Sequence, residues 1–183
     1  MTSIRKVRTC LIALAAAGLA AAGAADAAQQ GEMGATSSGS VGISLSVAPR
    51  ARISGLKDIS VSDADPASNL RTAQTVCVWS NSPAGAYTLT AGGSGSGGAF
   101  ELAGGQQTLA YSVEWAQGAG QASGQTLTGG QTATSLQAAA TQSDCGSGTG
   151  SASLVVAFNS DQLAAVQPDT AYTGALTLTI SPQ

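Results

Sequence analysis

The stretch Tyr-Thr-Gly-Ala-Leu-Thr-Leu-Thr-Ile, residues 172–180, shows the clearest structural pattern in the chain. Leu176, Leu178 and Ile180 alternate with smaller or more polar residues. In an extended segment every second side chain points to the same face. The pattern therefore predicts a β-strand with one buried face. We expect the neighbours of this strand to come from earlier residues or from another chain.

The same alternation recurs along the sequence. The predicted strands are 41–47 (with 51–54 as its continuation after a bend), 74–80, 87–91, 99–102, 109–115, 125–128, 152–158 and 172–180. Residues 135–141 fit either a strand or a helical turn, because alanine is a poor strand former. The one predicted helix is a single turn at 161–166. About seven to nine short strands separated by turn residues predict an all-β fold, an antiparallel β-sandwich.

Residues 1–27 have the parts of a secretory signal peptide. The segment opens with the basic residues Arg5, Lys6 and Arg8. An apolar stretch at 11–22 follows, and a small-x-small site ends at Ala27. The apolar stretch is too short and too rich in Ala and Gly to favour a membrane span. We expect export, with cleavage after Ala27 and Ala24 as the alternative site.

Beyond the signal peptide, we expect a flexible tail and one β domain. Residues 28–40 are polar and rich in Gly and Ser, which predicts the tail. The predicted β domain covers 41–183. Cleavage would leave two cysteines, Cys77 and Cys145. An even cysteine count in an exported chain predicts one disulfide between them.

The composition argues against several classes of function. Four basic residues stand against nine acidic ones after residue 27, which disfavours binding to nucleic acid or to anionic membranes. The chain has no histidine, so histidine-dependent triads and metal sites are excluded. We predict no catalytic residue, no cofactor and no metal site, and hence no enzyme.

The remaining carboxylates have simple structural interpretations. Asp63 and Asp65 loosely resemble a calcium loop, but the glycine and closing glutamate of an EF-hand are missing. A turn in which Asp side chains bond local backbone is the better prediction. Glu101 and Glu114 occupy the polar sides of two strands, so solvated faces are expected rather than a glycosidase pair.

The two tryptophans face different surroundings. Trp115 shares a strand face with three apolar residues, which predicts a core position. Trp79 lies on the Cys77 face of its strand, so it either packs against the disulfide or forms a candidate glycan contact.

Several segments together resemble one family of exported bacterial proteins, the spore coat protein U and CS1-like pilin group. Its members are subunits of chaperone–usher fimbriae of the archaic and alternate type. The segments are Ser54-Gly55-Leu56-Lys57-Asp58-Ile59, Val76-Cys77-Val78-Trp79-Ser80-Asn81, Tyr87-Thr88-Leu89-Thr90-Ala91, Ala99-Phe100-Glu101-Leu102, Leu109-Ala110-Tyr111-Ser112-Val113-Glu114-Trp115, Asp144-Cys145 and the ending from Tyr172 to Pro182.

This resemblance implies an incomplete immunoglobulin-like sandwich. Its missing strand would come first from a periplasmic chaperone and then, at the usher, from the N-terminal extension of a like subunit. The docking edge would be the final strand, with Leu176, Leu178 and Ile180. Location would be the periplasm in transit, then the cell surface or the extracellular medium.

The alternating residues Val41, Ile43, Leu45 and Val47 form a candidate donor strand. The alternative is that they form the first strand of their own domain. A second hypothesis for the whole protein is a self-contained secreted binding module or adhesin-like domain, in which Trp79 would contact glycan.

Overall fold

The structure is a computed structural model that describes residues 28–148 and 150–183. The predicted signal peptide, 1–27, lies outside the described residues. The chain divides into two units, Met1–Ser46 and Val47–Gln183. In the described part of the first unit every residue is exposed. Its one isolated bridge joins Gln29 to Ser40, with backbone hydrogen bonds of 2.9 and 3.0 Å.

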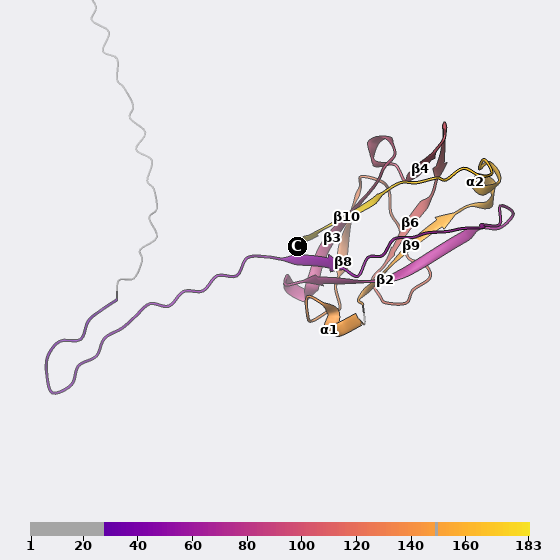
Figure 1. The fold of residues 1–183 in the computed structure, drawn as a ribbon. Helices are drawn as coiled ribbons and strands as arrows, with labels where there is room; N and C mark the ends of the chain where they lie inside the picture. The colour runs from indigo at the N-terminus through magenta and orange to yellow at the C-terminus, as the bar shows by residue number, and fades with distance from the viewer. Residues whose placement is uncertain (1–27, 149) are drawn as a thin grey trace, which may run out of the picture. The chain divides into compact units, whose positions relative to one another are not determined.

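The second unit is built from antiparallel strands (Figure 1). The five-stranded sheet has the order β1 (Ala51–Ser54), β2 (Leu70–Ser80), β9 (Ala152–Phe158), β6 (Ser112–Ala116) and β7 (Gln125–Thr126). The three-stranded sheet has the order β10 (Leu176–Pro182), β3 (Ala86–Gly93) and β8 (Thr132–Gln137), and β4 (Glu101–Gly104) pairs with β5 (Gln107–Ala110). The helical segments are η1 (Pro83–Gly85), η2 (Ser96–Gly98), α1 (Cys145–Gly148) and α2 (Ser160–Ala164).

Apolar faces of the two larger sheets contribute to one core. Every residue of β9 is buried, as expected for a strand that is apolar on both faces. The β2 residues Val76 and Val78 lie in the same cluster as Leu89 of β3. Trp115 is 2% exposed, and its indole N–H donates a 2.9 Å hydrogen bond to the Tyr87 hydroxyl. The predicted core position of Trp115 is therefore confirmed.

The predicted continuous strand 109–115 is wrong. The structure breaks it at Tyr111, because Ala110 pairs with Glu101 in the β4–β5 hairpin while Ser112 pairs with Ala157 of β9. The alternating face survives the break: the odd-numbered residues of this stretch, Leu109, Tyr111, Val113 and Trp115, are all buried. The pattern therefore reports burial correctly but does not show that the chain passes from one sheet to another.

The prediction of a strand at 41–47 is also wrong within the chain. These residues form no strand, and the apolar side chains are almost fully exposed: Val41 71%, Ile43 90%, Leu45 90% and Val47 70%. The first strand of the domain is instead β1, which pairs with the last four residues of β2. Pro49 lacks the N–H that a ladder would need upstream of β1.

Smaller differences concern element boundaries. The final strand begins at Leu176, because Thr173 is engaged in a separate bridge with Ala103. Of residues 135–141, for which strand and helical turn were both open, 135–137 belong to the strand β8 (Thr132–Gln137), and 138–141 are in neither a strand nor a helix. The predicted helical turn appears as α2, and the short helix α1 lies in a region where a loop was expected.

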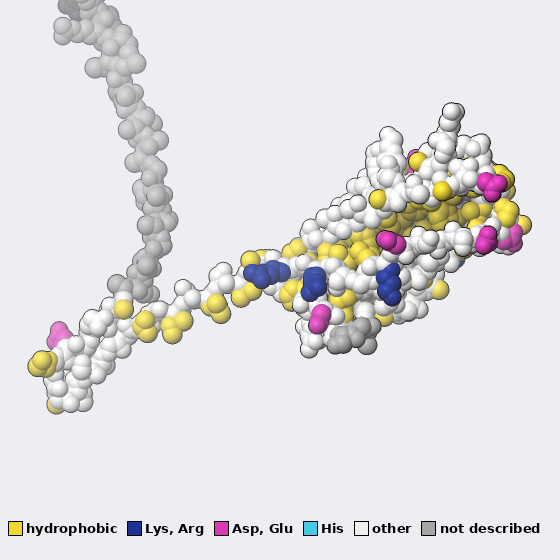
Figure 2. Space-filling view, viewed as in Figure 1, with side chains coloured by type: hydrophobic (Ala, Val, Ile, Leu, Met, Phe, Trp, Pro, Cys, Tyr) yellow, Lys and Arg dark blue, Asp and Glu magenta, His cyan; other side chains and the backbone are white. Residues whose placement is uncertain are grey.

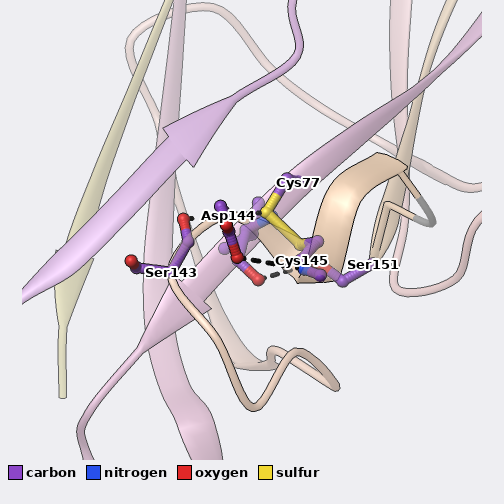
Figure 3. The surroundings of a disulfide bond; sticks show 7 residues. Cys77, Ser143, Asp144, Cys145 and Ser151 are labelled. Atoms are coloured by element: carbon purple, nitrogen blue, oxygen red, sulfur yellow. Dashed lines mark hydrogen bonds between the residues drawn. A yellow bond between two sulfur atoms is a disulfide. The ribbon is translucent and has the colours of Figure 1, made fainter.

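The predicted disulfide is present and joins β2 to the start of α1. Cys77 and Cys145 are bonded, and both are buried (Figure 3). Beside them, the Ser151 hydroxyl accepts a 2.8 Å hydrogen bond from the N–H of Val78 and donates a 2.7 Å bond to its carbonyl. The bond closes a long loop, with a sequence separation of 68.

Replacing both cysteines by alanine should lower the free energy of unfolding by about 4 kcal/mol, because the denatured chain regains the entropy of the closed loop. Urea unfolding of the non-reduced protein and of the double variant measures the difference. The wild-type protein unfolded in the presence of a reductant is the matched control and should give the same loss. An unchanged midpoint in both would contradict a stabilising role.

Candidate functional site

An apolar groove runs along the second unit between β10 and residues 56–59 (Figure 2). Its volume is about 480 Å³. The lining residues are Leu56, Lys57, Asp58, Ile59, Gln74, Leu102, Tyr111, Leu154, Val156, Phe158, Gly174, Ala175, Leu176 and Leu178. Both sheets and the β4–β5 hairpin contribute to this lining, so the groove opens directly onto the core.

The floor of the groove is made of aliphatic and aromatic side chains. Leu154, Val156 and Phe158 come from alternate positions of β9 and also belong to the core cluster. The ring of Tyr111 lies 5.8 Å from that of Phe158 and 5.7 Å from that of Phe100, measured between centroids. Burial raises the pKa of Tyr111 above its ordinary value, so the phenol stays neutral. The floor therefore suits apolar side chains.

One rim of the groove is β10, which the resemblance to fimbrial subunits predicts to be a docking edge. Among the described residues, β10 pairs with β3 alone, over its whole length. Leu176, Leu178 and Ile180 pack against the core but are only half-buried. Thus β10 has open hydrogen-bonding groups along one side and an incompletely covered apolar face.

The other rim is held by an amide side chain. The Gln74 side chain accepts a 2.8 Å hydrogen bond from the N–H of Lys57 and donates a 3.0 Å bond to its carbonyl. These two bonds resemble the pairing of two strand backbones. Because a side chain replaces one backbone, the two chains lie farther apart than in a ladder. We call this pair of bonds the Gln74 clamp. It holds residues 56–59 away from the β2 backbone, and Leu56 stays 47% exposed.

Gln74 did not emerge as a site residue from the sequence, although a signal was present. It has the same strand parity as Val76 and Val78, which face the core. A polar side chain on an otherwise apolar face needs a hydrogen-bond partner. That partner is the backbone of Lys57, 17 residues away in sequence.

The other residues singled out by sequence lie away from the groove. Trp79 is half-buried on β2, where it pairs with Arg52 of β1. Asp65 accepts hydrogen bonds from the Ala67 N–H and the Ser68 hydroxyl, both 2.9 Å, which confirms the turn interpretation. These bonds lower the pKa of Asp65.

Glu114 is not simply solvated. Its carboxylate accepts a 2.7 Å hydrogen bond from the Arg71 guanidinium and a 2.9 Å bond from the Gly124 N–H. The Arg71 bond, the Gly124 bond and the positive charge of Arg71 lower the pKa of Glu114 below its ordinary value. Because Arg71 is on β2 and Glu114 on β6, the pair spans the intervening strand β9.

Within residues 28–148 and 150–183, no group of three or more His, Cys, Asp or Glu side chains is arranged to hold a metal ion. None of the helices described there is long and apolar enough to cross a membrane. Comparisons with protein-family models, with curated proteins and with solved structures found no match.

Gln74→Ala should lower the free energy of unfolding by about 1–2 kcal/mol, because it leaves the backbone of Lys57 without two partners. It should also speed hydrogen exchange at the Lys57 amide, measured by NMR or mass spectrometry. Gln125→Ala is the matched control, because Gln125 is an exposed strand glutamine. Equal exchange at Lys57 in wild type and Gln74→Ala would show that the clamp does not hold this rim.

Glu114→Gln should destabilise the protein at pH 7 by no more than about 1 kcal/mol, as expected for a partly exposed ion pair. A lowered folded-state pKa contributes stability above the unfolded-state pKa, and that stability is lost as pH falls through the folded-state pKa. The difference between wild type and variant should therefore shrink below the ordinary carboxyl pKa of 4.5. Urea titrations between pH 7 and pH 2 test this. A difference that grows with acid would contradict the ion pair, and Glu101→Gln is the control.

Proposed function

We propose that the protein is an exported structural subunit of a surface fimbria that assembles by β-strand complementation through a chaperone–usher system. In this proposal the two larger sheets form an immunoglobulin-like sandwich that lacks one strand. The observation that carries the proposal is the groove, since it combines an exposed core with an unpaired strand edge. The resemblance of the sequence to fimbrial subunits and its N-terminal export pattern support it.

The proposed occupant of the groove is the segment 41–47 of a second copy of the chain. Its four apolar side chains alternate with Gly42, Ser44 and Ser46. They are exposed. The segment carries no charge, which suits a floor of aliphatic and aromatic side chains. The small residues between the apolar ones would face away from the core.

The lengths of donor and acceptor correspond. A strand of seven residues extends about 23 Å at a rise of about 3.3 Å per residue. The strand β10 is also seven residues long, and its first residues, Leu176 and Leu178, line the groove. Main-chain hydrogen bonds to this edge would supply sequence-independent affinity, and the alternate side chains entering the groove would supply specificity.

The same features explain the need for a partner during export. An exposed strand edge next to an apolar groove is a template for uncontrolled pairing. A periplasmic chaperone that covers both would keep the subunit soluble until a like subunit replaces it at the usher. The protein acts in this proposal as a structural partner and performs no catalysis.

A synthetic peptide covering residues 40–48 should bind the protein and raise its melting temperature. The acceptor protein should carry Ile43→Asp and Leu45→Asp, so that its own segment cannot compete. Titration of a fluorescently labelled peptide, followed by anisotropy, measures affinity. Hydrogen exchange should show new protection in β10, because its open edge gains a neighbour.

There are two matched control peptides, and each carries two aspartates. In one they replace residues of the apolar face, and in the other they replace residues of the opposite face. Asp at positions 43 and 45 should weaken binding by at least about tenfold, because two apolar side chains no longer enter the groove. Asp at positions 44 and 46 should leave binding nearly unchanged, because these residues face outward. Equal binding of both control peptides, or the absence of new protection in β10, would sink the proposal.

A further inference from the structure

The strand β1 lies close beside part of β10. Cα atoms of β1 come within 8 Å of Cα atoms of β10, although the two strands belong to different sheets and share no ladder. Neighbouring strands of a sheet are about 4.8 Å apart, so a strand inserted between two others needs them roughly 9.6 Å apart. No strand therefore fits between β1 and β10 where they approach each other.

The pairing of the strands shows which part of β10 this is. Ala51 pairs with Ser80, and Pro182 pairs with Tyr87, which follows Ser80 after the turn that contains η1. The start of β1 and the end of β10 therefore lie at the same end of the two sheets. Because β1 has four residues, it is level with the last four residues of β10. Residues 56–59 continue beyond β1 and are level with the first residues of β10.

The lining of the groove agrees with this division. Leu176 and Leu178 line the groove, whereas, of the residues that the structure describes, neither Ile180 nor any residue of β1 does. Ile180 and the β1 residue Ile53 instead pack against the core. The groove thus follows the first part of β10, and β1 closes the rest.

Amide side chains hold the chain at both ends of β1. Upstream, the Asn81 side chain accepts a 2.6 Å hydrogen bond from the Arg50 N–H and donates a 3.0 Å bond to the Ala48 carbonyl. Downstream, the Gln74 clamp holds Lys57. Between these two points every residue of β1 pairs with β2. The strand β1 is therefore a fixed boundary of the groove.

The hairpin of β4 and β5 bounds the groove at its other end. The N–H of Ala103 donates a 2.8 Å hydrogen bond to the Thr173 carbonyl, and the Thr173 N–H donates a 2.9 Å bond to the Ala103 carbonyl. A Cβ atom at Gly174 would lie 2.9 Å from the side chain of Leu102, so Leu102 fills the space there. The open stretch of this edge is thereby reduced to residues 175–178.

Two side chains of this open stretch point toward the core, Leu176 and Leu178. A strand added to the edge places its inward side chains level with these leucines, because residues opposite each other in a ladder lie on the same face. Two inward side chains of the added strand therefore enter the groove. They are two residues apart in its sequence.

We propose that β1 and the β4–β5 hairpin limit the docking surface for a second copy to residues 175–178, and that two neighbouring apolar residues of its segment 41–47 fill this surface. The inference rests on the proposed function, because it takes that segment as the occupant. It adds the length of the docking surface and the elements that bound it. The other two apolar residues of the segment stay outside the groove while β1 is in place.

Four variants of the peptide 40–48 test this limit, each with one substitution: Val41→Asp, Ile43→Asp, Leu45→Asp or Val47→Asp. Two neighbouring variants should bind the acceptor protein at least about tenfold more weakly than the unsubstituted peptide, because an apolar side chain is no longer buried. The other two should change the affinity by less than about twofold. Which two are affected also reports the direction in which the strand inserts.

Hydrogen exchange measured residue by residue by NMR locates the docking surface on the acceptor. The acceptor is the full chain with Ile43→Asp and Leu45→Asp, as in the titrations above. Bound peptide should add protection within residues 175–178 and leave residues 179–182 unchanged.

Arg52→Pro in the same acceptor tests whether β1 sets the limit. The Asn81 N–H bonds the Arg50 carbonyl at 3.0 Å, and bonded pairs recur at every second residue of an antiparallel ladder, so the Arg52 N–H points to β2. Proline removes this N–H and loosens β1. A third peptide variant should then also bind at least about tenfold more weakly than the unsubstituted peptide. Arg52→Ala keeps the N–H and is the matched control, which should behave like the parent acceptor.

The outcomes separate this inference from the proposed function. Equal weakening by all four substitutions with protection through residue 182, or an unchanged pattern in a folded Arg52→Pro acceptor, would overturn the limit set by β1 and leave strand donation intact. No binding of the unsubstituted peptide to any acceptor would overturn the proposed function itself. If Arg52→Pro loses the circular dichroism of the parent, the peptide series and the exchange pattern on the parent acceptor decide.

Discussion

The one-sided pairing of β10 is the constraint on which the rest of the structure depends. Strand backbones carry hydrogen-bonding groups on both sides, and these groups are satisfied by a neighbour or by water. β10 has β3 on one side, and its leucines reach the core without being covered. An edge of this kind is stable only while water or another strand occupies it. The open groove and the half-buried leucines are consequences of the same missing neighbour.

Two amide side chains, one on β2 and one just after it, bind the segment that flanks this gap. The main chain of β2 pairs with β1 over only four residues. On either side of that short ladder, Gln74 and Asn81 bind the backbone of the neighbouring segment with an amide. An amide side chain offers the same donor and acceptor as a peptide group but at a greater distance from the strand. A continuous main-chain ladder would instead draw residues 55–59 toward β2.

Much of the fold was predictable, because apolar and polar residues alternate in the sequence of a strand that is buried on one face. The core strands β3, β9 and β10 and the disulfide follow from alternation, apolar runs and cysteine count. The break at Tyr111 was not predictable, since the odd-numbered residues stay buried on both sides of it. The strand parity of Gln74 marks it as a polar residue that needs a partner, but neither its partner nor that of Asn81 was predictable. Their partners, Lys57 and the 48–50 backbone, are distant in sequence, and a side chain gives no sign of which backbone it will bind.

The segment 41–47 shows what alternation can and cannot establish. Its pattern is as regular as that of β10, yet its apolar side chains are exposed while those of β10 touch the core. A period of two reports that one face avoids water, but it carries no information about the chain that covers this face. In most domains that chain is the same one, so alternation is read as a core strand. Here the apolar face of the segment is exposed and β10 is paired on one side alone, and these two features are the basis on which donation to a second copy is proposed.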